Sequence, residues 1–263
     1  MDKVAVLGAG NMGSAIIDGL IKSAKYAPGQ IIATRRRKDI VNPWLEDGVE
    51  LLYDNITAAK EARYIILALQ PKNIPEVLNQ LVGHLREDHI IISIATGISL
   101  KYMRDFLGDE AKVFRAMPNT ASAVQEGITC LCAEENDQDQ QLYLVRELFE
   151  SIGEVVVIDE TLMDSATIIG ACGVAYSLKF MRAMMQGAIQ IGFDSKTAAK
   201  LVAHMVKGSA EILIENDSHP EAEIDRVTTP MGCTITGLNE MEHGGFSSAL
   251  IRGVLASYNV IEK

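Results

Sequence analysis

Three glycines near the start of the chain, Gly8, Gly10 and Gly13, have the spacing G-x-G-x-x-G. They follow the apolar run Val4–Leu7 and open a stretch with helical periodicity, which is the context that gives this spacing meaning. The first glycine permits a tight turn, the second lets a pyrophosphate approach the backbone, and the third allows close helix packing. Because a helix N-terminus attracts anions, the pattern predicts a dinucleotide site.

A polar cluster, Thr34-Arg35-Arg36-Arg37, ends the next apolar run, about twenty residues after the glycines. An NAD enzyme usually places a carboxylate here, on the ribose hydroxyls. A hydroxyl and guanidinium groups suit a 2′-phosphate instead, because arginine binds phosphate bidentately. The cluster therefore favours NADP over NAD. The alternative is that the arginines only lie on a solvated loop.

Turns follow three further apolar runs, at Ala68–Pro71, Ile94–Gly97 and Met117–Thr120. Ligands of open α/β sheets bind beyond the carboxyl ends of the strands. Each turn taken singly has an ordinary strand-to-loop composition. Together they predict a cleft at this edge of the sheet.

The predicted secondary structure that must position these residues differs between the two parts of the chain. Over residues 1–160, short runs rich in Ile, Val and Leu alternate with longer amphipathic stretches, which predicts an α/β domain of the doubly wound, Rossmann type: a parallel sheet with helices on both faces. Residues 161–263 lack this alternation and predict an all-helical domain. The expected strands are Lys3–Leu7, Gln30–Thr34, Tyr64–Leu69, His89–Ile94 and Lys112–Ala116, with a first helix over Gly10–Ser23.

Long helices are predicted over Asp164–Ile191, Ser195–Glu215 and from Ser247 to the C-terminus. Gly192 is a stop signal, and Asp194 or Ser195 is an N-cap for the second helix. The first helix is more apolar than a thin helical layer needs for its own core. A partner subunit would cover the excess; a single well-buried central helix is the alternative.

Composition excludes several classes of function. The formal charge of −11 leaves no basic stripe for a nucleic acid. The N-terminal apolar run is too short for a signal peptide, and no segment approaches the roughly 18 uninterrupted apolar residues of a membrane helix. Four cysteines without paired C-x-x-C spacing fit a reducing compartment and argue against structural zinc. We expect a cytoplasmic protein without a bound metal.

Three longer motifs carry a resemblance to a known family. They are R-A-M-P-N-T at Arg115–Thr120, D-S-A-T-I-I-G-A-C-G-V-A-Y at Asp164–Tyr176, and V-T-T-P-M-G-C-T-I-T-G-L from Val227, followed by E-H-G-G-F. In their order and spacing the chain resembles pyrroline-5-carboxylate reductases from end to end. The resemblance implies a Rossmann domain and a helical dimerisation domain, forming a homodimer or a larger homo-oligomer with its active site between subunits. The implied reaction is reduction of the cyclic imine 1-pyrroline-5-carboxylate to L-proline by hydride from NADPH, with NADH as the alternative donor.

The resemblance also implies roles for individual residues. The substrate loop falls on Thr229–Thr234, and its implied site residues are Thr229, Gly232, Cys233 and Thr234, whose hydroxyl bonds the ring nitrogen. Glu160 matches a position near the substrate. Cofactor contacts fall on Gly8, Gly10, Asn11, Met12, Gly13, Thr34, Arg35, Arg36, Asn55, Ala68, Gln70, Pro71 and Thr96.

Several residues depart from the family pattern, and Cys233 in the late loop, which replaces a hydroxyl residue, is one of them. Met231 stands where the family loop usually has glycine, and Gln70 stands where it usually has lysine. Cys172 and Val174 replace a serine and a proline at the start of the first long helix. These departures leave open a related imine reductase with altered ring specificity, or a nucleotide-binding homologue without turnover. A β-hydroxyacid dehydrogenase is a further alternative, although Arg182 and Ala183 stand where its asparagine would be, after Lys179.

Overall fold

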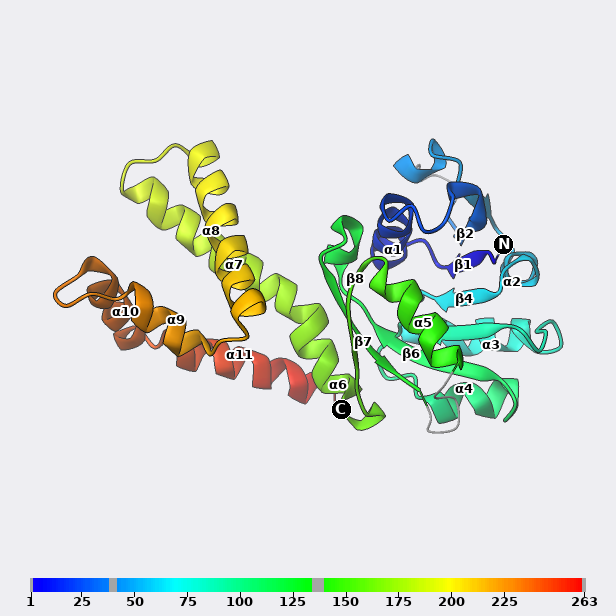
Figure 1. The fold of residues 1–263 in the computed structure, drawn as a ribbon. Coiled ribbons are helices and arrows are strands. Elements are labelled where there is room, and N and C mark those ends of the chain that lie inside the picture. The colour runs from blue at the N-terminus through cyan, green and yellow to red at the C-terminus, as the bar shows by residue number, and fades with distance from the viewer. Residues whose placement is uncertain (1, 38–41, 134–139, 262–263) are drawn as a thin grey trace. The chain divides into compact units, whose positions relative to one another are not determined.

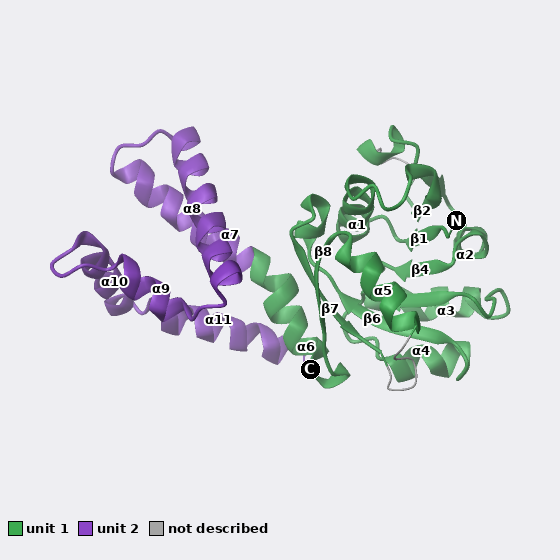
Figure 2. Ribbon diagram, viewed as in Figure 1, with its two compact units in different colours: residues 1–174, 262 green, residues 175–261, 263 purple. Residues whose placement is uncertain are grey.

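The computed structural model describes residues 2–37, 42–133 and 140–261 (Figure 1). The chain divides into two compact units, residues 1–174 and 175–261, which are described separately (Figure 2). The division falls later than the boundary predicted at 160/161, because the first turns of the long helix pack on the sheet. Met163 and Ile168 are buried there, and the Asn119 Nδ2 donates to the Gly170 carbonyl at 3.0 Å.

The first unit is built on one eight-stranded sheet in the order β3-β2-β1-β4-β5-β6-β7-β8. This order, with its crossovers on either side of β1, is the Rossmann-type doubly wound topology that the sequence predicts. The strands are β1 Val4–Leu7, β2 Ile31–Thr34, β3 Glu50–Leu52, β4 Tyr64–Leu67, β5 Ile90–Ser93, β6 Lys112–Met117, β7 Gly127–Cys132 and β8 Gly153–Val157.

The sheet is mostly parallel, as predicted, but β7 and β8 run opposite to the first six strands. β7 runs antiparallel to β6, pairing Arg115 with Cys132, whereas β8 is parallel to β7. Antiparallel neighbours need only a short connection, and here the turn η4 (Thr120–Val124) supplies it. The strands β3, β7 and β8 are not among the predicted ones. The burial of β7 alternates along the strand, so it lacks the continuous apolar run of a central parallel strand.

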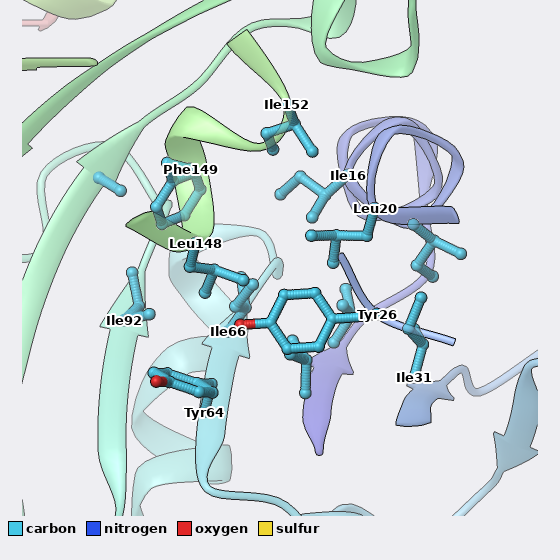
Figure 3. Close-up of a cluster of buried hydrophobic side chains, with 14 of the residues drawn as sticks. Ile16, Leu20, Tyr26, Ile31, Tyr64, Ile66, Ile92, Leu148, Phe149 and Ile152 are labelled. Atoms are coloured by element: carbon cyan, nitrogen blue, oxygen red, sulfur yellow. The ribbon is translucent and has the colours of Figure 1, made fainter. Parts of the chain in front are cut away.

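Helices cover both faces of the sheet (Figure 1). On one face, α1 (Asn11–Lys22) and α5 (Gln140–Glu150) bury Ile16, Leu20 and Phe149 in a core cluster that Figure 3 shows. The other face is covered by α2 (Asn55–Glu61), α3 (Ile74–Leu81) and α4 (Leu100–Leu107). Short 3₁₀ turns connect the elements at Pro28–Gln30, Pro43–Leu45, Pro71–Asn73 and Glu160–Leu162.

The helical region begins with α6 (Met163–Ala166), a π-helical stretch (Thr167–Cys172) and α7 (Gly173–Gln190). It continues with α8 (Ser195–Asn216), α9 (Pro220–Val227), α10 (Cys233–His243) and α11 (Phe246–Ile261). The predicted signals between α7 and α8 are confirmed: Gly192 has φ +115°, and the Asp194 carboxylate accepts from the Lys196 and Thr197 amides. The short helices α9 and α10 are not predicted by the sequence.

The second unit buries very little by itself. Among its described residues, only Ala198 and Val202 are buried, while Ile191 is 79% and Ile214 is 72% exposed. The helical run Glu160–Gln190 contains an 18-residue window with a mean hydropathy of 1.2 and is long and apolar enough to cross a membrane on composition alone. Lys179 and Arg182 interrupt it, and a single helix of this kind is weak evidence because helices of soluble proteins meet the same test. An exposed apolar surface of this extent is typical of an interaction site.

Candidate functional site

A cavity of about 490 Å³ opens in the first unit, beyond the carboxyl ends of β1, β2 and β4. This is the edge where open α/β sheets bind ligands. Its lining contains residues from the glycine turn, the end of β2, the start of α2, the end of β4 and helix α3. They are Gly8, Ala9, Gly10, Thr34, Arg35, Arg36, Arg37, Tyr53, Asp54, Asn55, Ala68, Leu69, Gln70, Asn73, Glu76, Val77 and Gln80.

The three glycines of the fingerprint have different surroundings. Gly8 has φ +105°, and a Cβ there would lie 2.5 Å from the Ala68 carbonyl oxygen. A Cβ on Gly13 would overlap the Gly8 carbonyl oxygen. A Cβ on Gly10 would meet nothing within 4 Å. Gly8 and Gly13 are therefore required by packing. At Gly10 the lack of a side chain leaves the backbone accessible from the cavity.

Hydrogen bonds join the glycine turn to α3 across the cavity wall. The Gly8 N–H approaches the Thr34 Oγ1 at 3.3 Å, and the buried Thr34 hydroxyl donates to the Asn55 Oδ1 at 2.7 Å. The Asn55 Nδ2 donates in turn to the Gln80 Oε1 at 3.2 Å. Thr34 and Asn55, which are distant in sequence, are thus brought together as the resemblance implies.

Positive charge dominates the rim of the cavity at the end of β2. The Arg35 Nη2 donates to the Ala9 carbonyl at 2.7 Å, while Arg36 and Arg37 are exposed. The Asp54 carboxylate on the same wall caps α2, accepting from the Thr57 amide at 2.7 Å and from the Thr57 hydroxyl. These hydrogen bonds lower the pKa of Asp54. That carboxylate therefore stays ionised, and with Glu76 it places two negative charges in a cavity lining that also holds three arginines.

Some predicted cofactor residues do not line this cavity: Asn11, Met12, Gly13, Pro71 and Thr96. Asn11 and Met12 begin α1, and Thr96 follows β5, so they border the same sheet edge. Sequence reasoning missed Glu76, Val77 and Gln80, which share one face of α3. Their i, i+1, i+4 spacing behind the β4 turn is a signal that could have indicated them.

The late loop is shorter than the predicted Thr229–Thr234. The Gly232 N–H donates to the Thr229 carbonyl at 3.0 Å, closing a turn with Pro230 and Met231 at its centre. Met231 has φ +58° and a fully exposed side chain, so it occupies the left-handed conformation that usually requires glycine. Cys233 and Thr234 belong to the exposed first turn of α10, where a helix N-terminus offers unpaired N–H groups.

The Glu160 carboxylate is engaged within the first unit. Its Oε1 accepts from the Arg115 Nη1 at 3.0 Å and from the Leu100 amide at 2.8 Å, at the N-terminus of α4. Arg115 is buried, and its Nη2 has no hydrogen-bond partner among the described residues. Nearby, burial raises the pKa of the Cys132 thiol to about 12. The predicted place of Glu160 beside a substrate stays a prediction, and the structure adds a structural role.

We expect Glu160→Ala to lower the free energy of unfolding by about 2 kcal/mol, because it leaves a buried guanidinium without its carboxylate. The value lies below that of a fully buried pair because the Glu160 side chain is 33% exposed. Urea unfolding measures it, with Glu160→Gln as the control that keeps an acceptor for Leu100. Unchanged stability combined with lost turnover would instead assign Glu160 to the substrate.

Comparisons of this sequence with known proteins support a dinucleotide-binding unit followed by a helical unit. The family model for pyrroline-5-carboxylate reductase dimerisation matches residues 160–263, and the NADP oxidoreductase coenzyme F420-dependent model matches residues 3–97. Pyrroline-5-carboxylate reductase 2 of Dictyostelium discoideum is 38% identical over 97% of this chain and 90% of its own. The chain belongs to the pyrroline-5-carboxylate reductase family. The resemblance predicted from the motifs is confirmed.

Other members of the pyrroline-5-carboxylate reductase family support the same assignment. The chain is 38% identical to pyrroline-5-carboxylate reductase 1 of Dictyostelium discoideum but spans 48% of that longer protein. A Plasmodium falciparum pyrroline carboxylate reductase, solved with NADP bound, superposes with a TM-score of 0.89 at 26% identity, over 99% of this chain and 97% of that one. A 3-hydroxyisobutyrate dehydrogenase from Mycobacterium tuberculosis is 14% identical with a TM-score of 0.54, a likeness of fold alone. The hydroxyacid dehydrogenase alternative thus gains no support beyond the fold.

Proposed function

We propose that this chain reduces 1-pyrroline-5-carboxylate to L-proline with hydride from NADPH, or from NADH as the alternative donor. The observation that carries the proposal is 38% identity to a named pyrroline-5-carboxylate reductase over 97% of the chain. The NADP-bound relative supports the cofactor, and so does the arginine-rimmed cavity behind the glycine turn.

One set of residues would bind the cofactor, and another set would bind the imine. The bare backbone at Gly10 would face the pyrophosphate, and Arg35 and Arg36 would face the 2′-phosphate. The turn at Thr229–Gly232 and the N-terminus of α10 would hold the substrate carboxylate. The Thr234 hydroxyl would hydrogen-bond the ring nitrogen, and the proton that this nitrogen needs would come from solvent water, either before binding or during reduction. A bound nicotinamide supplies the hydride, so the protein need only orient and polarise the imine.

The test is NADPH oxidation, followed by absorbance, with 1-pyrroline-5-carboxylate as substrate and NADH run in parallel. Fast oxidation that depends on the imine is expected. Tight NADPH binding without oxidation would contradict the proposal and favour the homologue without turnover.

One observation favours a second candidate, an imine reductase with altered ring specificity. Met231 projects an exposed apolar side chain from the turn proposed to bind substrate. The six-membered imine carboxylate, assayed beside the five-membered one, separates the candidates. A preference for the larger ring would establish the second candidate.

We further propose a homodimer or larger homo-oligomer through the helical unit, located in the cytoplasm. The match to a dimerisation model and the exposed apolar helices support the assembly. Free cysteines at positions 130, 132, 172 and 233 fit a reducing compartment. Light scattering across a dilution series should give at least twice the mass of one chain. A stable, folded monomer would contradict the assembly.

A further inference from the structure

The polarity of the hydrogen bonds on the cavity wall sets what Thr34 offers to a ligand. The Thr34 hydroxyl has one hydrogen, and it donates this hydrogen to the Asn55 Oδ1 at 2.7 Å. Asn55 has this orientation because its Nδ2 faces the Gln80 Oε1 at 3.2 Å. The Thr34 Oγ1 also accepts from the Gly8 N–H at 3.3 Å, so toward the cavity it can act only as an acceptor, through its remaining lone pair.

An acceptor at this place discriminates between two forms of a ribose. Thr34 ends β2, the position from which Rossmann domains contact the ribose 2′ group. A free 2′-hydroxyl can donate to the Thr34 Oγ1, whereas a phosphate dianion has no hydrogen to donate. Recognition of the phosphate is left to the arginines. The Arg35 Nη2 already donates to Ala9, and the exposed Arg36 lines the same cavity.

We propose that Gln80 is a positioning residue which, through Asn55, holds the Thr34 hydroxyl as an acceptor for an unphosphorylated ribose and so lets the site accept NADH beside NADPH. The inference rests on the proposed dinucleotide function. Gln80 acts at a distance: its Oε1 contacts Asn55, and Asn55 contacts Thr34.

The test compares Gln80→Leu with the wild-type chain by measuring the dissociation constants of NADPH and NADH without imine. Without its acceptor, the Asn55 amide can turn and release the Thr34 hydroxyl hydrogen to a phosphate. The ratio of NADPH to NADH affinity should rise about threefold to tenfold, the equivalent of one neutral hydrogen bond. Gln80→Glu keeps an acceptor, so its NADH affinity should stay within about twofold of wild type.

Two further variants serve as controls, one for the charge added by Gln80→Glu and one for the route through Thr34. Asn79→Asp places the added charge of Gln80→Glu on an exposed neighbour in α3 that does not line the cavity. In a Thr34→Val background, Gln80→Leu should leave the ratio unchanged. An unmoved ratio in the single variant, or an equal shift in both backgrounds, would overturn the inference. Failure of the proposed function would look different: the wild-type chain would bind neither cofactor, or it would bind NADPH without imine-dependent oxidation while the affinity ratio still responded to Gln80→Leu.

Discussion

Replacing Gly10 by alanine is expected to abolish tight NADPH binding while leaving the fold intact. Gly10 has φ −83°, which alanine adopts freely, and the added Cβ meets nothing within 4 Å. The methyl group would instead occupy the space that a pyrophosphate needs to reach the backbone N–H groups. Losing one or two charge-assisted hydrogen bonds corresponds to a loss of affinity of about 10²-fold or more.

The matched control for Gly10→Ala is Gly13→Ala. A Cβ on Gly13 would overlap the Gly8 carbonyl oxygen, so this variant should lower the free energy of unfolding by about 3 kcal/mol. Titration of NADPH fluorescence together with urea unfolding separates the two effects. Gly10→Ala costs about 0.5–1 kcal/mol, because alanine is a poorer residue than glycine at the N-cap of α1. If Gly10→Ala bound NADPH as tightly as the wild-type chain, the pyrophosphate could not lie at this turn.

Thr234→Ala is expected to lower turnover of the imine by about 10²-fold, the effect of removing one donor that acts on the developing charge at a reacting centre. Thr234 belongs to the exposed first turn of α10 in the second unit, whereas the residues that line the cavity all belong to the first unit. The dissociation constant of NADPH should therefore stay within about twofold of wild type, because no cofactor contact is removed. Steady-state kinetics and a binding titration on the same preparation provide both values.

Two nearby substitutions make the Thr234 result specific. Thr236→Ala removes a hydroxyl that already donates to the Gly232 carbonyl at 3.1 Å in the same helix, so its effect on turnover should be small. Thr234→Ser retains a hydroxyl and should restore most of the activity. Equal losses of turnover in the two alanine variants, or loss of NADPH binding in Thr234→Ala, would remove Thr234 from the role at the ring nitrogen.

Local sequence patterns were sufficient to predict many of the helices and strands of this protein. The glycine spacing and the following apolar periodicity predict β1 and α1 to within a few residues, because both depend on neighbours along the chain. The helices α7, α8 and α11 were also predictable from the sequence, because each is a long apolar stretch. The signals that separate α7 from α8, Gly192 and Asp194, are local as well. The motifs spread along the chain were enough to identify the family.

Only the tertiary structure decided which distant residues meet. Gln80 meets Asn55, which in turn binds Thr34, because α3 packs beside α2, and the Arg115 partner of Glu160 comes from β6. The reversal of β7 and the start of α10 at Cys233 also escaped prediction, since strand direction depends on pairing and a short exposed helix has weak local signals. Sequence alone thus determined the family, the cofactor turn and the order of the main elements, whereas the contacts that orient individual side chains arise from packing between segments far apart in the chain.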